Sequence, residues 1–281
     1  MYDGVSLSDG LQRAAGELRL SVKRRGDGSV LDGLRQAGCL KARFPRALSR
    51  GWLDATTVNT SGGVVGGDRL ESVISVGEGA RATIAAQAAE RFYRALPGSE
   101  PSVARTAVSV GPDASAEWLP QETILFDRCA LDRCLTIDVA PGSWFLGVEM
   151  LVFGRAAMGE RVVQAQLRDL IRVCRGGELL LHDAIRLDGE VDQVLEATAT
   201  AGGARSVATL VYVAPDAETR LDAVREALTM AAKGDNFGAS AWNGMLIARI
   251  LALAGAPVRQ SVMAALAVLR DGRPLPRAWL C

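Results

Sequence analysis

The most conspicuous candidate for chemistry is a glycine-rich run at residues 61–69, which reads Ser-Gly-Gly-Val-Val-Gly-Gly-Asp-Arg. Glycine adopts backbone dihedrals that are closed to other residues, so such a run can cradle an anion. A phosphate loop needs a Lys-Ser or Lys-Thr pair and then a helix, but residues 70–76 have the apolar pattern of a strand. The sequence therefore favours a tight β-turn or bulge in which Asp68 and Arg69 pair or cap, and an anion- or nucleotide-handling enzyme remains the alternative.

Carboxylates that stand beside bulky apolar residues form a second group of candidates. They are Glu122 and Asp127 within residues 118–128, Glu149 between a valine and a methionine, and Glu178 ahead of a leucine triplet. A carboxylate in such surroundings is costly unless a partner compensates it. Paired carboxylates can act as general acid and base, but no nucleophile and base are identifiable together, so salt bridges to nearby arginines are the simpler explanation.

Nitrogen and sulfur ligands for a metal are scarce in the sequence. His182 is the one histidine, which nearly excludes a His-ligated zinc hydrolase. Cys129 and Cys134 are spaced more widely than in the usual metal knuckle, so buried or hairpin thiols are favoured. Scattered carboxylates, thiols and one imidazole can still hold nickel weakly, because nickel accepts all three. The odd number of cysteines, 5, at irregular spacing predicts reduced thiols and no secreted disulfide framework.

The composition is that of a globular protein suited to protein partners. Of 281 residues, 49% are hydrophobic and 23% are charged, and 32 basic side chains balance 32 acidic ones. Zero net charge removes the long-range attraction that nucleic-acid binders use, and it favours association between proteins. No apolar stretch reaches the roughly 18 residues of a membrane span, and residues 1–10 lack an export signal, so a cytoplasmic protein is predicted.

An all-β body is predicted to position these candidates. Between Leu18 and Leu210, short apolar or alternating runs are separated by glycine, proline or charged turns, which is the pattern of successive strands. The turns at residues 77–79, 111–113 and 140–142 have spacings suited to hairpins and meanders. Because there is no repeat of fixed period and no low-complexity linker, one continuous domain over residues 1–281 is favoured.

Two helices are predicted in the C-terminal third. The first opens at Asp216, which can cap it, and apolar residues within 221–231 form one helical stripe. The second opens at Pro257 and can end at Gly272. The apolar segment 241–253 between them fits a strand or a helix, and we favour a strand.

Several separated blocks, in the same order, resemble the UreD (UreH) family of urease accessory proteins. The two most specific blocks are residues 59–69, with Gly62, Gly63, Gly66, Gly67 and Arg69, and residues 118–126, with Pro120 and Gln121. The other blocks are residues 13–18, 85–94 with Gln87, 149–160, and 275–279 with Pro276 and Trp279. One departure is Ser61, where proline is common in the family.

The resemblance implies a mainly β fold, a single large helicoid or sandwich-like UreD-like domain with about two α-helices near the C-terminal third. It also implies a non-enzymatic urease accessory scaffold, with UreF, UreG through UreF, and the apo-urease subunits as partners. A dimer within the accessory complex is a further expectation, whereas no nucleic acid, membrane or tightly bound cofactor is expected. A purely structural adaptor without a metal path is an alternative.

The family is further proposed to provide an internal, water-filled path along which Ni²⁺ moves to the urease active site. A conduit should bind its ion weakly at several oxygens and release it, because one tight ligand cage would trap the ion. Scattered carboxylates fit this requirement. The candidate transient nickel-path residues are therefore Asp68, Glu122, Asp127, Glu149 and Glu178.

Overall fold

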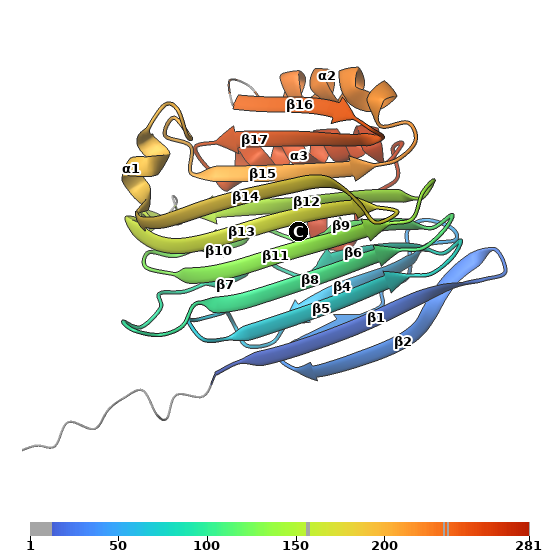
Figure 1. The fold of residues 1–281 in the computed structure, drawn as a ribbon, viewed down its shortest axis with the longest axis horizontal. Coiled ribbons are helices and arrows are strands. Elements are labelled where there is room, and N and C mark those ends of the chain that lie inside the picture. The colour runs from blue at the N-terminus through green and yellow to red at the C-terminus, as the bar shows by residue number, and fades with distance from the viewer. Residues whose placement is uncertain (1–12, 156–157, 233, 235, 281) are drawn as a thin grey trace, which may run out of the picture.

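Two β-sheets packed face to face form the body of the protein (Figure 1). The structure is a computed structural model that describes residues 13–155, 158–232, 234 and 236–280. Sheet A has the strand order β14 (Glu178–Glu190), β13 (Gln164–Arg175), β11 (Ala130–Val139), β8 (Ser102–Val110), β5 (Arg69–Val76), β1 (Ala15–Arg25) and β2 (Gly28–Gly38).

Sheet B is wider than sheet A and lies behind it in Figure 1. Its order is β16 (Asn236–Trp242), β17 (Met245–Ala252), β15 (Ser206–Val213), β12 (Trp144–Phe153), β9 (Ser115–Leu119), β6 (Arg81–Ala86), β4 (Leu53–Asn59) and β3 (Leu40–Arg43). Two short strands, β10 (Thr123–Leu125) and β7 (Glu90–Phe92), continue from β12 beside this row.

Successive strands in the middle of the chain alternate between the two sheets. The turn at residues 77–79 leads from β5 in sheet A to β6 in sheet B, and the turns at 111–113 and 140–142 join β8 to β9 and β11 to β12. The strands within each sheet are therefore parallel here, as in the β5–β8–β11 and β6–β9–β12 rows. The prediction of hairpins at these turns was wrong, because alternation shows a buried face but not which strand pairs with which.

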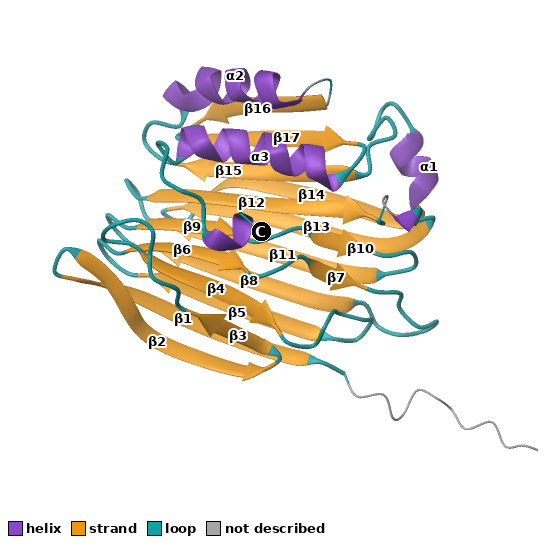
Figure 2. Ribbon diagram, turned by 180° about the vertical axis from the view of Figure 1, so that it is seen from behind, coloured by secondary structure: helices purple, strands orange, loops and turns teal. Residues whose placement is uncertain are grey.

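Side chains alternate along each strand and bury one face in the core between the sheets. In β11, for example, Leu131, Leu135, Ile137 and Val139 are buried in this core. A second apolar core lies on the other side of sheet B, where α2 (Leu221–Ala232) and α3 (Gly255–Leu269) cover it (Figure 2). The molecule thus has three layers, and its mainly β fold confirms the predicted fold class.

The two predicted helices are α2 and α3, and the segment 241–253 contains β17, as favoured. Gly272 has φ +71°, and its N–H donates to Ala267 O at 3.0 Å, which closes the end of α3. Asp216 does not cap a helix, because its carboxylate accepts hydrogen bonds from the Tyr212 hydroxyl and the Arg220 guanidinium. The first predicted helix, which was expected to open at Asp216, begins with the short 3-10 helix η2 (Glu218–Arg220) and continues as α2. The short helices α1 (Val191–Glu196) and η3 (Arg277–Trp279) were not predicted. No helix in the described part of the chain is long and apolar enough to cross a bilayer.

Candidate functional site

A cavity of about 280 Å³ lies between the two sheets, beside the short strands β7 and β10. Both sheets contribute to its wall, and the glycine-rich run closes part of it with Gly62 and Gly63. Its polar lining side chains include those of Asn59, Glu90, Gln121, Thr123, Arg133 and Glu149. This cavity is the candidate functional site because it brings carboxylates into a partly open space between the sheets.

A buried ion triad lies at the wall of the cavity, to which Arg133 and Glu149 contribute directly. Arg133, on the inward face of β11, donates from Nε and Nη2 to the two oxygens of Asp169 on β13 at 2.7 and 2.8 Å. Its Nη1 donates to Glu149 Oε2 at 2.6 Å and therefore links sheet A to β12 of sheet B. The second Glu149 oxygen accepts from Trp118 Nε1 at 2.8 Å. Each charge of the triad has a partner, as burial requires.

Burial is the largest influence on Glu149 and raises its pKa, although the charge of Arg133 and the Trp118 hydrogen bond oppose this effect. Burial alone would lower the pKa of Arg133, but the charges of Asp169 and Glu149 outweigh it and raise that pKa. Arg133 therefore stays a cation. A second cation that entered the cavity would have to compete with this guanidinium for Glu149.

Glu90 is a cavity residue that the sequence analysis missed. It begins β7, and Asn59 Nδ2 on β4 lies 3.1 Å from each of its carboxylate oxygens. Burial raises the pKa of Glu90, and the Asn59 hydrogen bond only partly opposes this effect. The signal used for Glu149 was present here as well, because Glu90 follows two alanines and precedes Phe92 within two positions.

Glu117 is a second carboxylate that the sequence did not point out. It is fully buried on β9 and binds Arg270 Nε at 2.9 Å, Arg273 Nη2 at 2.7 Å and the Thr83 hydroxyl at 2.7 Å. Arg270 directly follows α3, so this network fastens the end of that helix to sheet B. Glu117 does not line the cavity, so its role is to hold the end of α3 on sheet B.

Of the five predicted nickel-path residues, the structure brings only Glu149 to the cavity wall. Asp68 is buried, and its two oxygens accept from Ala14 N at 2.8 Å and Val65 N at 2.9 Å. It therefore caps the backbone of the glycine-rich turn, which is one of the two roles predicted for it. Arg69 is the exposed first residue of β5.

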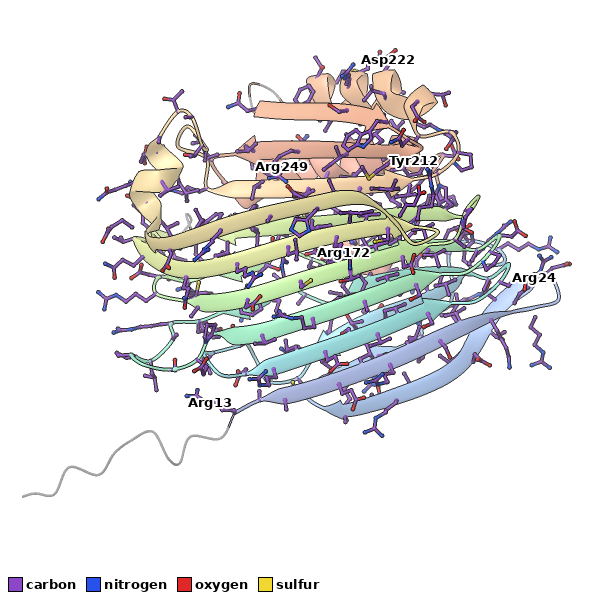
Figure 3. All side chains as sticks on the ribbon, in the orientation of Figure 1. Arg13, Arg24, Arg172, Tyr212, Asp222 and Arg249 are labelled. Atoms are coloured by element: carbon purple, nitrogen blue, oxygen red, sulfur yellow. The ribbon has the colours of Figure 1, made fainter. Side chains whose placement is uncertain are left out.

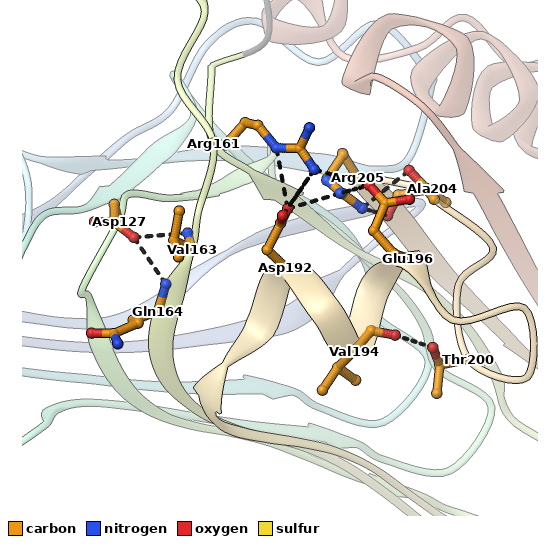
Figure 4. A network of polar contacts seen from close by, with 11 residues as sticks. Asp127, Arg161, Val163, Gln164, Asp192, Val194, Glu196, Thr200, Ala204 and Arg205 are labelled. Carbon is orange, nitrogen blue, oxygen red and sulfur yellow. Dashed lines mark hydrogen bonds and ion pairs between the residues drawn. The ribbon is translucent and has the colours of Figure 1, made fainter.

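Glu122, Asp127 and Glu178 lie elsewhere. Glu122 pairs with Arg259 of α3 at 2.9 Å. One oxygen of Asp127 accepts from the backbone N–H groups of Val163 and Gln164 at 2.8 and 3.0 Å (Figure 4). Glu178 is exposed at the start of β14.

The remaining metal-ligand types are also dispersed. Cys129 is buried, and this burial raises the pKa of its thiol to about 12. His182 is exposed on β14. In the part of the chain that the structure describes, no three His, Cys, Asp or Glu side chains are grouped so that they could hold a metal ion.

The C-terminal tail packs against the segment that precedes β10. Gln121 Nε2 donates to Ala278 O at 2.7 Å, and Trp279 Nε1 donates to Leu119 O at 3.0 Å. The Arg259 guanidinium lies 4.8 Å from the Trp279 ring centroid and donates to Gln121 Oε1 at 2.6 Å. Gln121 thus connects the cavity wall to the tail.

Comparison with known proteins places the chain in a family. The family model for the UreD urease accessory protein matches residues 14–280. This chain belongs to the UreD family.

Its relatives match it over nearly their whole length. A protein named urease accessory protein UreD 2 from Methylorubrum populi is 45% identical over 273 residues, which is 95% of this chain and 91% of the relative. Proteins named urease accessory protein UreD from Methylobacterium sp. strain 4-46 and Dinoroseobacter shibae are 43% and 41% identical. These matches cover 95% and 98% of this chain, and 95% of each relative. The resemblance seen in the separate blocks is confirmed.

Four of the six UreD-like blocks contribute lining residues to the cavity, namely 59–69, 85–94, 118–126 and 149–160. Gly62 and Gly63 of the first block line it together with Gln87, and Pro120 and Gln121 come from another block. The last block, with the buried residues Pro276 and Trp279, reaches the same region through Gln121. Gly63 has φ +144°, and a Cβ there would lie 2.2 Å from the Tyr93 ring, so this glycine permits a close approach of turn and ring.

Proposed function

We propose that this UreD-family chain is a non-enzymatic scaffold of urease maturation, which binds apo-urease together with UreF, binds UreG through UreF, and assists nickel insertion. In this proposal the chain acts in the cytoplasm, within an accessory complex that can be dimeric. The cavity between the sheets is part of the path of Ni²⁺, the cargo, and no cofactor is bound tightly.

The observation that carries the proposal is the cavity with Glu90 and Glu149 in its wall. Both carboxylates are already engaged, Glu90 by Asn59 and Glu149 by Arg133 and Trp118. An ion that displaces such partners gains only the difference between two sets of contacts, so binding is weak and release is fast. Weak oxygen ligands in succession are what a path requires.

A structural adaptor without a metal path is the second candidate. Three of the predicted path residues support it, because they lie outside the cavity and their carboxylates already have structural partners. Asp68 and Asp127 accept hydrogen bonds from backbone N–H groups, and Glu122 pairs with Arg259. A nucleotide-handling role for the glycine run has less support. The run leads into β5 and not into a helix, and Asp68 occupies backbone N–H groups that an anion would need.

Substitution of the two cavity carboxylates separates these functions. Glu90→Gln with Glu149→Gln keeps the shape of both side chains and removes their charge. When the variant is co-expressed with UreF, UreG and apo-urease, we expect the complex to assemble and the nickel content of urease to fall at least tenfold. Glu178→Gln, at an exposed site, is the control that leaves nickel loading unchanged.

If the complex assembles and the nickel content of urease is unchanged, the proposed nickel path is rejected and the structural adaptor remains. If the unsubstituted chain formed no complex with UreF and apo-urease, the scaffold itself would be rejected. Circular dichroism and the unfolding midpoint of each variant show whether a loss comes from misfolding.

A further inference from the structure

Sheet A does not extend over the whole width of sheet B. Its last strand is β14, which pairs with β13 on one side and with no other described strand on its second side. Beyond that open edge, β17 and β16 of sheet B continue (Figure 1). An open edge of this length presents unpaired backbone groups that can add a further strand.

In the part of sheet B beyond β14, the two faces of the sheet differ in burial. Toward α2 and α3, Leu246, Ala248 and Ile250 of β17 are fully buried. On the opposite side of β17, Ile247 and Leu251 are only half-buried, because sheet A has no strand in front of them. This opposite face therefore carries apolar residues, as a core face does, but no strand of sheet A packs on it.

A single side-chain bridge marks the boundary of the covered region. Asp183 of β14 pairs with Arg249, which stands between Ile247 and Leu251 on β17. Figure 3 shows Arg249 on the part of sheet B that lies past β14, and Arg172 on the outer face of sheet A. Further out, β16 presents the small exposed residues Gly238 and Ser240, which leave room over the sheet.

The outer face of the two edge strands has an excess of unpaired positive charge. Arg168 of β13 stands directly opposite Arg186 of β14, and Arg172 stands opposite His182. Like charges directly opposite each other in a sheet are destabilising. None of these three arginines has an ion pair or hydrogen bond with another described residue. Of the carboxylates nearby on this face, Asp132 is bound to Arg105 at 2.8 Å, which leaves Asp188, two residues after Arg186, against three arginines.

We propose that the open edge of β14 is a docking site for an extended segment of a partner protein, in which acidic residues alternate with apolar ones. The segment adds to sheet A as its next strand. Its apolar side chains cover Ile247 and Leu251, and its carboxylates, on the opposite face, meet Arg168, Arg172 and Arg186. Backbone pairing supplies the affinity, and the alternation of charge and apolarity supplies the specificity.

The same charges disfavour a second copy of this chain as the occupant. Antiparallel pairing of two β14 strands centred on Ala184 would place Arg186 of each copy opposite His182 of the other, beside the Arg168 side chains. A pairing centred on Leu187 would place Arg186 opposite Asp188 of the other copy, but it would overlap only residues 184–190 and leave Arg172 without a carboxylate. A partner segment with acidic residues along its whole length can face all three arginines, which neither of these pairings achieves.

The probe for this site is a capped, fluorescently labelled peptide of about nine residues with alternating glutamate and valine, long enough for one strand. Fluorescence anisotropy with the full chain at low salt should show binding below 1 mM. We expect at least tenfold weaker binding for the lysine–valine peptide and for the Arg168→Glu, Arg186→Glu variant. Arg25→Glu, an exposed position at the end of β1 and far from β14, is the matched control and should bind like the unsubstituted chain.

Peptides methylated on alternate backbone nitrogens test the strand pairing itself. One methylation register blocks the N–H groups that face β14, and the other blocks those that face solvent, so only one should abolish binding. No binding up to 1 mM, equal binding of the two registers, or unchanged binding by the charge-reversed variant would overturn the proposal. A dimer in light scattering that is lost in the Arg168→Glu, Arg186→Glu variant would overturn the proposal and show that β14 pairs with a second copy.

Discussion

Arg133 and Asp169 form a bidentate ion pair inside the protein, with Nε–Oδ1 and Nη2–Oδ2 distances of 2.7 and 2.8 Å. The pair lies on neighbouring strands of sheet A, and the guanidinium also reaches Glu149 of sheet B. Because Asp169 satisfies two of the guanidinium donors, it determines the position from which Arg133 contacts Glu149. Asp169 is thus a positioning residue for the cavity wall, although it does not line the cavity itself.

Asp169→Ala should destabilise the fold by about 3–5 kcal/mol, because it leaves two buried donors of Arg133 without a partner. Urea denaturation measures this free energy. Asp138→Ala on the same sheet, at an exposed position, should change it by no more than about 0.5 kcal/mol. A loss below about 1 kcal/mol for Asp169→Ala would mean that water replaces the carboxylate.

The buried Glu90 should make stability depend on pH. Burial raises its pKa above the usual value of 4.5 in the folded protein. A carboxyl group with a raised folded pKa stabilises the fold most below its unfolded pKa, and this contribution is lost as the pH rises through the folded pKa. The loss is about 1.4 kcal/mol for each pH unit by which the pKa is raised.

Glu90→Gln cannot ionise and should avoid this loss. We therefore expect its unfolding free energy, relative to that of the unsubstituted chain, to increase between about pH 4 and pH 7, measured by urea denaturation at several pH values. A difference that stays constant over this range would show that Glu90 ionises at its ordinary pKa.

The glycine-rich turn offers a matched pair of substitutions. Both Gly62 and Gly63 have positive φ, but a Cβ at Gly62 meets no atom within 4 Å, whereas a Cβ at Gly63 lies 2.2 Å from the Tyr93 ring. Gly63→Ala should therefore cost about 1–3 kcal/mol more than Gly62→Ala, since it adds overpacking to backbone strain. Thermal unfolding of the two variants tests this order, and equal melting temperatures would contradict it.

Trp279 should be the main anchor of the C-terminal tail. Trp279→Ala removes a buried ring, its hydrogen bond to Leu119 O and its contact with Arg259, so we expect a loss of about 3–5 kcal/mol. Limited proteolysis should also cut the variant faster near its C-terminus. The neighbouring Leu280 is mostly exposed, and Leu280→Ala is the control that leaves both measurements unchanged.

The periodicity of the sequence was sufficient to predict a strand-rich body and the helices α2 and α3. Each such element buries one face, and the spacing of its apolar residues is visible locally in the sequence. The topology was not predictable in the same way. A turn such as residues 140–142 looks alike whether it joins neighbours in one sheet or, as here, carries the chain from β11 to β12 in the other sheet.

The site was predictable only in part. Glu149 follows from the rule that a carboxylate among apolar residues needs a partner, and the same rule applies to Glu90, where it was not used. It was misleading for Glu178, because the leucine triplet after it includes Leu179, which is 53% exposed at the start of an edge strand. Nothing local identifies Arg133, whose partners lie 16 and 36 residues away.

The contact between Trp279 and Leu119 spans 160 residues and involves the short helix η3. During translation Leu119 is synthesised long before Trp279, so this part of sheet B stays uncovered until the later segment has emerged and packed on it. A chain that stopped before residue 277 would keep this surface of sheet B exposed.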